Sequence, residues 1–489
     1  MDVVDNDEAR EDIVHRFNAQ LPYRDSLPKE RDLLLADIVG ALTSAAGTQE
    51  NTVRVLRACS GLGLIRGLKY NIDDGSRLFI AQGLCDLAFP TTGVPLPWQC
   101  GNKVMHSLTT LISKKQGQLA LVGKLVLPWR SMFATLDECA PRGFPLASGS
   151  TERSGLKALV DLIRHARRYW APGADREIWD EFKEEIALTQ TQAAFRALYL
   201  LCLFMPTRSS LYGELLPEWF RLWGQVDHCP SWDGAWLTLM CRATQHPPST
   251  FDWTPYMADI YNLARATIKT PVSMGDAGAA PLPRSRHVAY QYHSIAPSAC
   301  RSGIVKLNKL AVMVVFFLGK GGPAELVRMS DVAIVPPAGE GVDGAYGGGG
   351  GDKQHLISPG AQDLMSLFRG LRTYFHPSNG GRWTTDLAFL TNFVLSGLAE
   401  RVGCETVLRE AGRSPPTGEL TRGDAQLVVD ALLPLVLEMV YSKDSSMGSI
   451  ANNCLSVLAT LSPKTVAPAA VEVILRALDP VASINHTHQ

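Results

Sequence analysis

Residues 452–478 read NNCLSVLATLSPKTVAPAAVEVILRAL, and this stretch decides the fold of the chain. Residues 452–461 predict one helix, Ser462-Pro463-Lys464 predicts a turn, and residues 466–478 predict the next helix. The two helices form an antiparallel pair, and neither can bury its apolar stripe alone. In the second helix, apolar side chains recur at i, i+3, i+4 and i+7, namely at Val471, Ile474, Leu475 and Leu478.

Other parts of the chain show the same helical spacing. One apolar stripe runs from Leu156 to Trp170, and another occupies residues 427–440, where Pro434 should kink the helix or restart it. Thr254-Pro255 offers an N-cap hydroxyl followed by a ring whose φ already suits a helix. Antiparallel helix pairs that stack side by side form an α-solenoid, as in HEAT and armadillo repeats. The sequence therefore predicts an all-α, HEAT-like α-solenoid without a strict repeat period.

Two stretches rich in glycine and proline interrupt the helices and predict flexible surface insertions. They are residues 273–303 and residues 336–360, and the second contains the run Gly347–Gly351, whose ordering would cost too much entropy for a packed core. The predicted organisation is a helical region 1–272, the insertion 273–303, and a second helical region 304–489 that carries the insertion 336–360. Residues 331–335 are a candidate for a short extended piece.

Composition and charge exclude several classes of protein. Hydrophobic residues make up 46% of the chain, enough for a continuous core, and the formal net charge of −1 argues against nucleic acid as a direct partner. The ten cysteines form no Cys-x-x-Cys pair, which favours reduced thiols in an intracellular protein over zinc sites or disulfides. Residues 1–12 lack the layout of a signal peptide. Because the longest apolar run, Leu310–Leu318, is shorter than the roughly 20 residues that span a bilayer, we expect no membrane segment.

The glycine-rich segments do not match the motifs of cofactor sites. Residues 61–67 lack the G-x-G-x-x-G spacing and a preceding strand, so they predict a turn between helices rather than a dinucleotide site. Gly319-Lys320-Gly321-Gly322 lacks the first glycine and the Ser or Thr of a phosphate-binding loop. Signatures of serine hydrolases, zinc proteases and kinases are missing as well. We expect no catalytic residue, no cofactor and no metal ligand.

Two aromatic features admit both a structural and a functional interpretation. In residues 374–383, His376 precedes a proline and should be extended, so the segment predicts a tight corner between two helices, anchored by aromatic rings. The functional alternative has His376 and Arg382 gripping a ligand. A group of tryptophans could form a recognition surface, but their helical spacing favours core packing. They are Trp219, Trp223, Trp232, Trp236 and Trp253.

These segments together resemble the family of large single-chain HEAT-repeat proteasome activators, proteasome activator complex subunit 4. The most specific match, residues 375–383, is similar to the family's Tyr-His-Pro-Ser-Asn-x-Gly-Arg-Trp segment, which opens its middle HEAT-repeat region. Further matches keep the family's order along nearly the whole chain, from Leu21-Pro22-Tyr23 through the tryptophan group. The positions that carry the resemblance, expected to be structural, are Pro128, Trp129, Arg130, Asp252, Trp253, Pro255, Tyr256, His376, Pro377, Ser378, Asn379, Gly381, Arg382 and Trp383.

The resemblance implies a regulator rather than an enzyme. It implies binding to the α-ring of the proteasome core particle, opening of the gate, and ATP- and ubiquitin-independent protein degradation in the nucleus and cytoplasm. DNA repair and the breakdown of acetylated histones are also attributed to the family. The family docks through a C-terminal hydrophobic-Tyr-x tail and reads acetyl-lysine through its C-terminal region, whereas this chain ends in residues 485–489, NHTHQ. We therefore expect a piece of a longer protein that binds the core weakly and activates it little.

Two other classes of protein stay open. A general HEAT-repeat adaptor of the transport-receptor type would bind cargo without proteasome subunits, and a hydrolase would stay active after removal of every proteasome subunit. The last predicted helix should also expose apolar surface at residues 471–478, because a solenoid needs a polar cap at its end.

Overall fold

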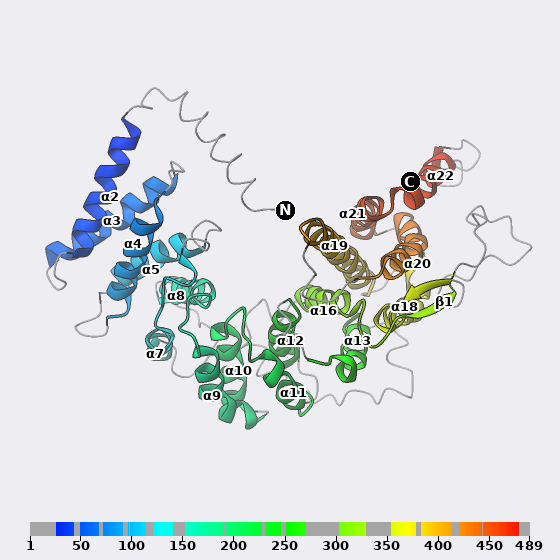
Figure 1. The fold of residues 1–489 in the computed structure, drawn as a ribbon, viewed down its shortest axis with the longest axis horizontal. Coiled ribbons are helices and arrows are strands. Elements are labelled where there is room, and N and C mark those ends of the chain that lie inside the picture. The colour runs from blue at the N-terminus through cyan, green and yellow to red at the C-terminus, as the bar shows by residue number, and fades with distance from the viewer. Residues whose placement is uncertain are drawn as a thin grey trace, which may run out of the picture. The chain divides into compact units, whose positions relative to one another are not determined.

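The computed structural model describes residues 26–43, 49–67, 72–90, 96, 98–113, 121–139, 152–189, 191–226, 230–245, 251–268, 303–328, 354–377, 383–412, 420–442 and 444–478. Within these ranges the chain is almost entirely helical (Figure 1). It forms two compact units, which divide between Ser209 and Ser210. The predicted division at residues 272 and 304 stays a prediction, because residues 269–302 lie outside the described ranges.

The first unit is a stack of helices. They are α2 (Leu27–Thr43), α3 (Gln49–Gly67), α4 (Asp74–Ala88), α5 (Trp98–Ser113), α7 (Trp129–Cys139), α8 (Glu152–Ala166), α9 (Ala174–Ala187) and α10 (Gln192–Phe204). Helices contact both their neighbour in sequence and the one beyond it, so that α4 packs against α2 and α5, and α5 against α3 and α8. This pattern is typical of helix pairs that share one continuous core.

Side-chain caps explain where some helices begin. Ahead of α4, Asp73 Oδ1 accepts a hydrogen bond from Ser76 N at 2.9 Å. Ahead of α10, Thr191 Oγ1 accepts one from Ala194 N at 3.1 Å. Each cap satisfies a backbone N–H that has no partner inside the helix, so these two side chains fix the first turn.

Two sequence-based predictions for the first unit are wrong. Residues 61–67 form the last turns of α3 rather than a turn between helices, and Leu62 and Ile65 of this segment are buried, with exposed fractions of 5% and 1%. Packing there outweighs the poor helix propensity of glycine. Trp170 lies beyond the end of α8 instead of on its stripe, and its Nε1 donates to Phe204 O of α10 at 2.7 Å.

The second unit adds a small sheet to its helices. Its helices are α11 (Tyr212–Trp223), α12 (Pro230–Gln245), α13 (Thr254–Ile268), α16 (Gly303–Phe317), α18 (Pro359–Leu371), the 3-10 helix η2 (Arg372–Phe375), α19 (Trp383–Glu410), α20 (Arg422–Val440), α21 (Ser445–Leu461) and α22 (Pro463–Leu478). Strands β1 (Glu325–Arg328) and β2 (Gln354–Ile357) pair antiparallel, with Leu326 opposite Leu356. Helix α16 packs against α12, α13 and α19, and α21 packs against α19, α20 and α22.

The helix pair on which the fold prediction rested is confirmed as α21 and α22. Val466 and Val473 bury one face of α22, with exposed fractions of 1% and 8%. The opposite face exposes 51% of Val471, 56% of Ile474 and 63% of Leu475, which confirms the expected apolar surface on this helix. The all-α, HEAT-type α-solenoid is therefore the fold of this chain.

The second unit also corrects several details of the predicted elements. Helix α20 continues through Pro434, so the predicted restart is wrong, while the predicted kink stays a prediction. An internal proline costs about 3 kcal/mol, and the burial of apolar side chains on several sides of α20 offsets this cost. The insertion predicted at 336–360 is too long, because its last residues form β2 and the capped start of α18. The observed strand is Glu325–Arg328, while residues 331–335 and 347–351 lie outside the described ranges.

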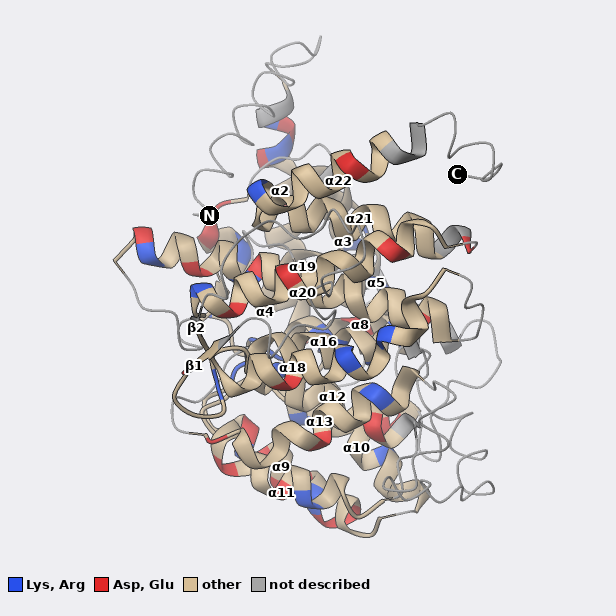
Figure 2. Ribbon diagram, turned by 90° about the vertical axis from the view of Figure 1, so that its right-hand side faces the viewer, with Lys and Arg blue, Asp and Glu red and all other residues tan. Residues whose placement is uncertain are grey.

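Charges are distributed without a dominant sign along the described helices. Basic and acidic residues alternate with many uncharged ones (Figure 2). Among the described helices, none combines the length and the apolar character that crossing a membrane requires.

Candidate functional site

The motif residues of the first unit join α7 to α9 and α10. Trp129, the first residue of α7, is 5% exposed, and its Nε1 donates to Glu177 Oε2 of α9 at 3.2 Å. Arg130 donates to the same oxygen at 3.2 Å and lies 3.5 Å from Glu181 Oε2, with its guanidinium 4.6 Å from the Trp129 ring centroid. Pro128 O accepts from Met132 N in the first turn of α7. These residues hold helices together.

The second motif, residues 252–256, anchors the start of α13. Asp252 Oδ1 accepts the Thr254 N–H at 3.0 Å, so Asp252 supplies the cap that the sequence analysis assigned to the Thr254 hydroxyl. This hydrogen bonding lowers the pKa of the Asp252 carboxyl. Trp253 is 3% exposed and packs against aromatic rings of α11 and α16, while Tyr256 stacks on Phe220 with ring centroids 3.9 Å apart. Pro255 follows in the first helical turn.

The third motif lies where η2 leads into α19. His376 is exposed and has φ −57° and ψ 132°, the extended backbone expected before Pro377. Tyr374 of η2 and Trp383 of α19 meet edge to face with centroids 5.8 Å apart, so aromatic rings anchor both helices of the corner as predicted. Ser378, Asn379, Gly381 and Arg382 lie outside the described residues, as does Leu21-Pro22-Tyr23. The three motifs thus occupy separate helix junctions.

The tryptophan group belongs to the core, which confirms the structural interpretation. Trp219, Trp232 and Trp236 are fully buried, and Trp223 and Trp253 are 3% exposed. Trp236 lies 6.1 Å from Trp219 and 5.8 Å from Trp232, measured between ring centroids. Trp223 Nε1 donates to the buried carboxylate of Asp233 at 2.8 Å. These tryptophans cannot act as an exposed recognition surface in this structure.

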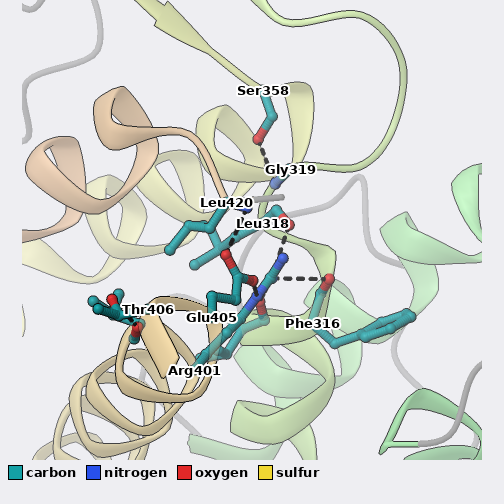
Figure 3. A network of polar contacts seen from close by, with 10 residues as sticks. Phe316, Leu318, Gly319, Ser358, Arg401, Glu405, Thr406 and Leu420 are labelled. Atoms are coloured by element: carbon teal, nitrogen blue, oxygen red, sulfur yellow. Dashed lines mark hydrogen bonds and ion pairs between the residues drawn. The ribbon is translucent and has the colours of Figure 1, made fainter. Parts of the chain in front are cut away.

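A buried polar junction in the second unit connects helices that are far apart in sequence (Figure 3). Arg401 Nη1 of α19 donates to the carbonyls of Val315 at 2.7 Å, Phe316 at 3.3 Å and Leu318 at 2.9 Å, which satisfies the C-terminal end of α16. Arg401 Nε binds Glu405 Oε1 at 2.7 Å, and the other carboxylate oxygen of Glu405 accepts from Leu420 N at 3.0 Å. The junction therefore ties α16, α19 and the segment before α20 together.

A second set of hydrogen bonds continues from this junction to the small sheet. Ser358 Oγ caps α18 through Ala361 N and also accepts from Gly319 N at 2.9 Å, just beyond α16. Ser358 N donates to Asp424 Oδ1 of α20 at 2.8 Å. Gly360 is required at this point, because a Cβ there would lie 2.1 Å from Phe317 O. Burial and the nearby Arg401 charge lower the pKa of Lys320 in the same corner.

Burial makes three cysteine thiols of the described ranges weak acids. Burial raises the pKa of the Cys85 and Cys454 thiols to about 12 and that of Cys241 to about 11, so these cysteines carry no thiolate near neutral pH. No three His, Cys, Asp or Glu side chains of the described ranges gather closely enough to hold a metal ion. The polar interactions of this part of the chain join helices to one another.

Sequence reasoning missed the polar junction. Thr421 and Asp424 do have a capping-box spacing, and Thr421 Oγ1 accepts from Asp424 N at 2.9 Å. Ser358-Pro359 likewise has the spelling of a helix start. Arg401 and Glu405 have the i,i+4 spacing of a helical ion pair, but the sequence does not show that Arg401 also reaches backbone carbonyls more than 80 residues earlier in the chain.

The stacked helix pairs and the motif residues at their junctions define a helical-repeat scaffold of the HEAT type. The family model described as proteasome activator complex subunit 4, mid HEAT repeats region, matches residues 364–489. Proteasome activator complex subunit 4 of Homo sapiens is 24% identical over 495 residues, and subunit 4A of Danio rerio is 25% identical over 500 residues. Proteasome activator subunit 4 of Arabidopsis thaliana is 24% identical over 371 residues, 74% of this chain and 17% of the relative. This chain is therefore similar to the proteasome activator subunit 4 family along most of its length, and residues 364–489 match that family's mid HEAT repeats region.

The match covers most of this chain but a small part of its relatives. The human alignment includes 97% of this chain and 23% of the human protein, and the Danio rerio alignment includes 96% and 23%. The chain therefore spans about a quarter of the length of these relatives.

Proposed function

We propose that this chain is part of a proteasome activator, which regulates the proteasome core particle by binding and performs no catalysis itself. The observation that carries the proposal is the similarity over 97% of the chain to a relative named as a proteasome activator subunit. The fold suits this role, because stacked helix pairs provide an extended surface for a large partner. The positions of the motif residues at helix junctions suit a scaffold more than a compact active site.

The proposed mechanism is a shift of the gate equilibrium of the core particle. A protein that binds the open-gate form more tightly than the closed form raises the open population in proportion to that difference in affinity. The core particle then hydrolyses its substrates without ATP or ubiquitin. The proposal places this activity in the nucleus and cytoplasm. For a protein of the relatives' length, it also includes roles in histone degradation and DNA repair.

A direct binding experiment tests the proposal. Purified core particle is immobilised, and binding of the 489-residue chain is measured by interferometry, with an unrelated HEAT-repeat protein of similar length and net charge as the control. We expect saturable binding above the control, with a Kd weaker than about 1 μM for this 489-residue piece. No binding above the control, together with capture of transport cargo, would favour the adaptor. Peptide hydrolysis by the chain alone would favour the hydrolase.

A further inference from the structure

We draw no further inference here: the strongest candidate, the exposed apolar stripe of Val471, Ile474 and Leu475 on α22, lies on the last helix that the structure describes, and nothing in the structure shows what covers it.

Discussion

Asp233 of α12 and Lys306 of α16 form a buried ion pair, with 2.8 Å between Oδ2 and Nζ and side-chain exposures of 1% and 13%. The other oxygen of Asp233 accepts the indole N–H of Trp223 in α11. One carboxylate therefore connects three helices of the second unit. Because a buried charge without its partner is costly, removing either residue alone should lower the stability of the fold.

Removing the Asp233 carboxylate should destabilise the second unit strongly. The Asp233→Ala change removes the carboxylate that pairs with the buried Lys306 ammonium, and we expect a loss of about 3–5 kcal/mol in the free energy of unfolding. Urea unfolding measures the change. Adding Lys306→Met to this variant removes the unpaired charge and should recover part of the loss. The exposed pair of Lys183 and Asp180 gives a control, since Lys183→Ala should cost no more than about 1 kcal/mol. Equal losses for Asp233→Ala and Lys183→Ala would contradict the prediction.

Arg401 should stabilise the fold through its hydrogen bonds to the carbonyls at the C-terminal end of α16. The Arg401→Met change keeps most of the side chain's length, but it removes the guanidinium that donates to those carbonyls and leaves the buried Glu405 carboxylate without its positively charged partner. We expect a loss of about 3–5 kcal/mol in unfolding free energy, measured by denaturant titration. The matched variant Arg409→Met changes an exposed arginine of the same helix and should stay within about 0.5 kcal/mol of the wild type. If the two variants are equally stable, Arg401 does not hold this junction.

Substituting alanine for Gly360 and for Gly403 should change the stability of the protein in opposite directions. At Gly360, alanine places a Cβ 2.1 Å from Phe317 O, so the start of α18 must move away from α16 and the protein should lose stability. A Cβ at Gly403 in α19 meets nothing within 4 Å, so Gly403→Ala should stabilise the helix by about 0.5–1 kcal/mol. Thermal unfolding of both variants checks the pair. A Gly360→Ala protein as stable as the wild type would show that α16 and α18 do not approach so closely.

The pH dependence of stability should reflect Glu438 of α20. Burial raises the pKa of its carboxyl above 4.5, with a smaller opposite effect from Arg372 and His376. A folded-state pKa above the unfolded value means that the fold favours the protonated form, so ionisation of Glu438 destabilises the protein at neutral pH. Glu438→Gln should therefore be more stable than the wild type at pH 7, and the difference should shrink as the pH falls towards 4.5.

Denaturant unfolding at several pH values measures this difference. The exposed Glu410 supplies a matched variant, Glu410→Gln, which removes one negative charge from α19 without changing a buried group. If the difference in unfolding free energy between Glu438→Gln and the wild type stays constant from pH 7 to 4.5, burial does not raise the pKa of this carboxyl.

The sequence predicts what depends on local periodicity, and it misses what depends on distant backbone. The pair α21 and α22, the buried tryptophans and the aromatic corner at Tyr374 and Trp383 follow from spacing and side-chain type. The three glycines within residues 61–67 locally favour a turn, whereas the burial of Leu62 and Ile65 in the first unit accompanies a helix there. The contacts of Arg401 with the end of α16 could not be predicted for another reason. Every residue has a backbone carbonyl, so the sequence does not show which carbonyls accept hydrogen bonds from Arg401.

The most direct test of the proposed function is competition with a full-length relative. A labelled full-length proteasome activator subunit 4 is bound to immobilised core particle, and the purified chain is then titrated in. If both proteins bind the same α-ring surface, the chain should displace the relative at concentrations above about 1 μM and lower the stimulated peptide hydrolysis in parallel. If the relative stays bound and its stimulation is unchanged at about 100 μM of correctly folded chain, this part of the protein does not bind the core particle where the activator does.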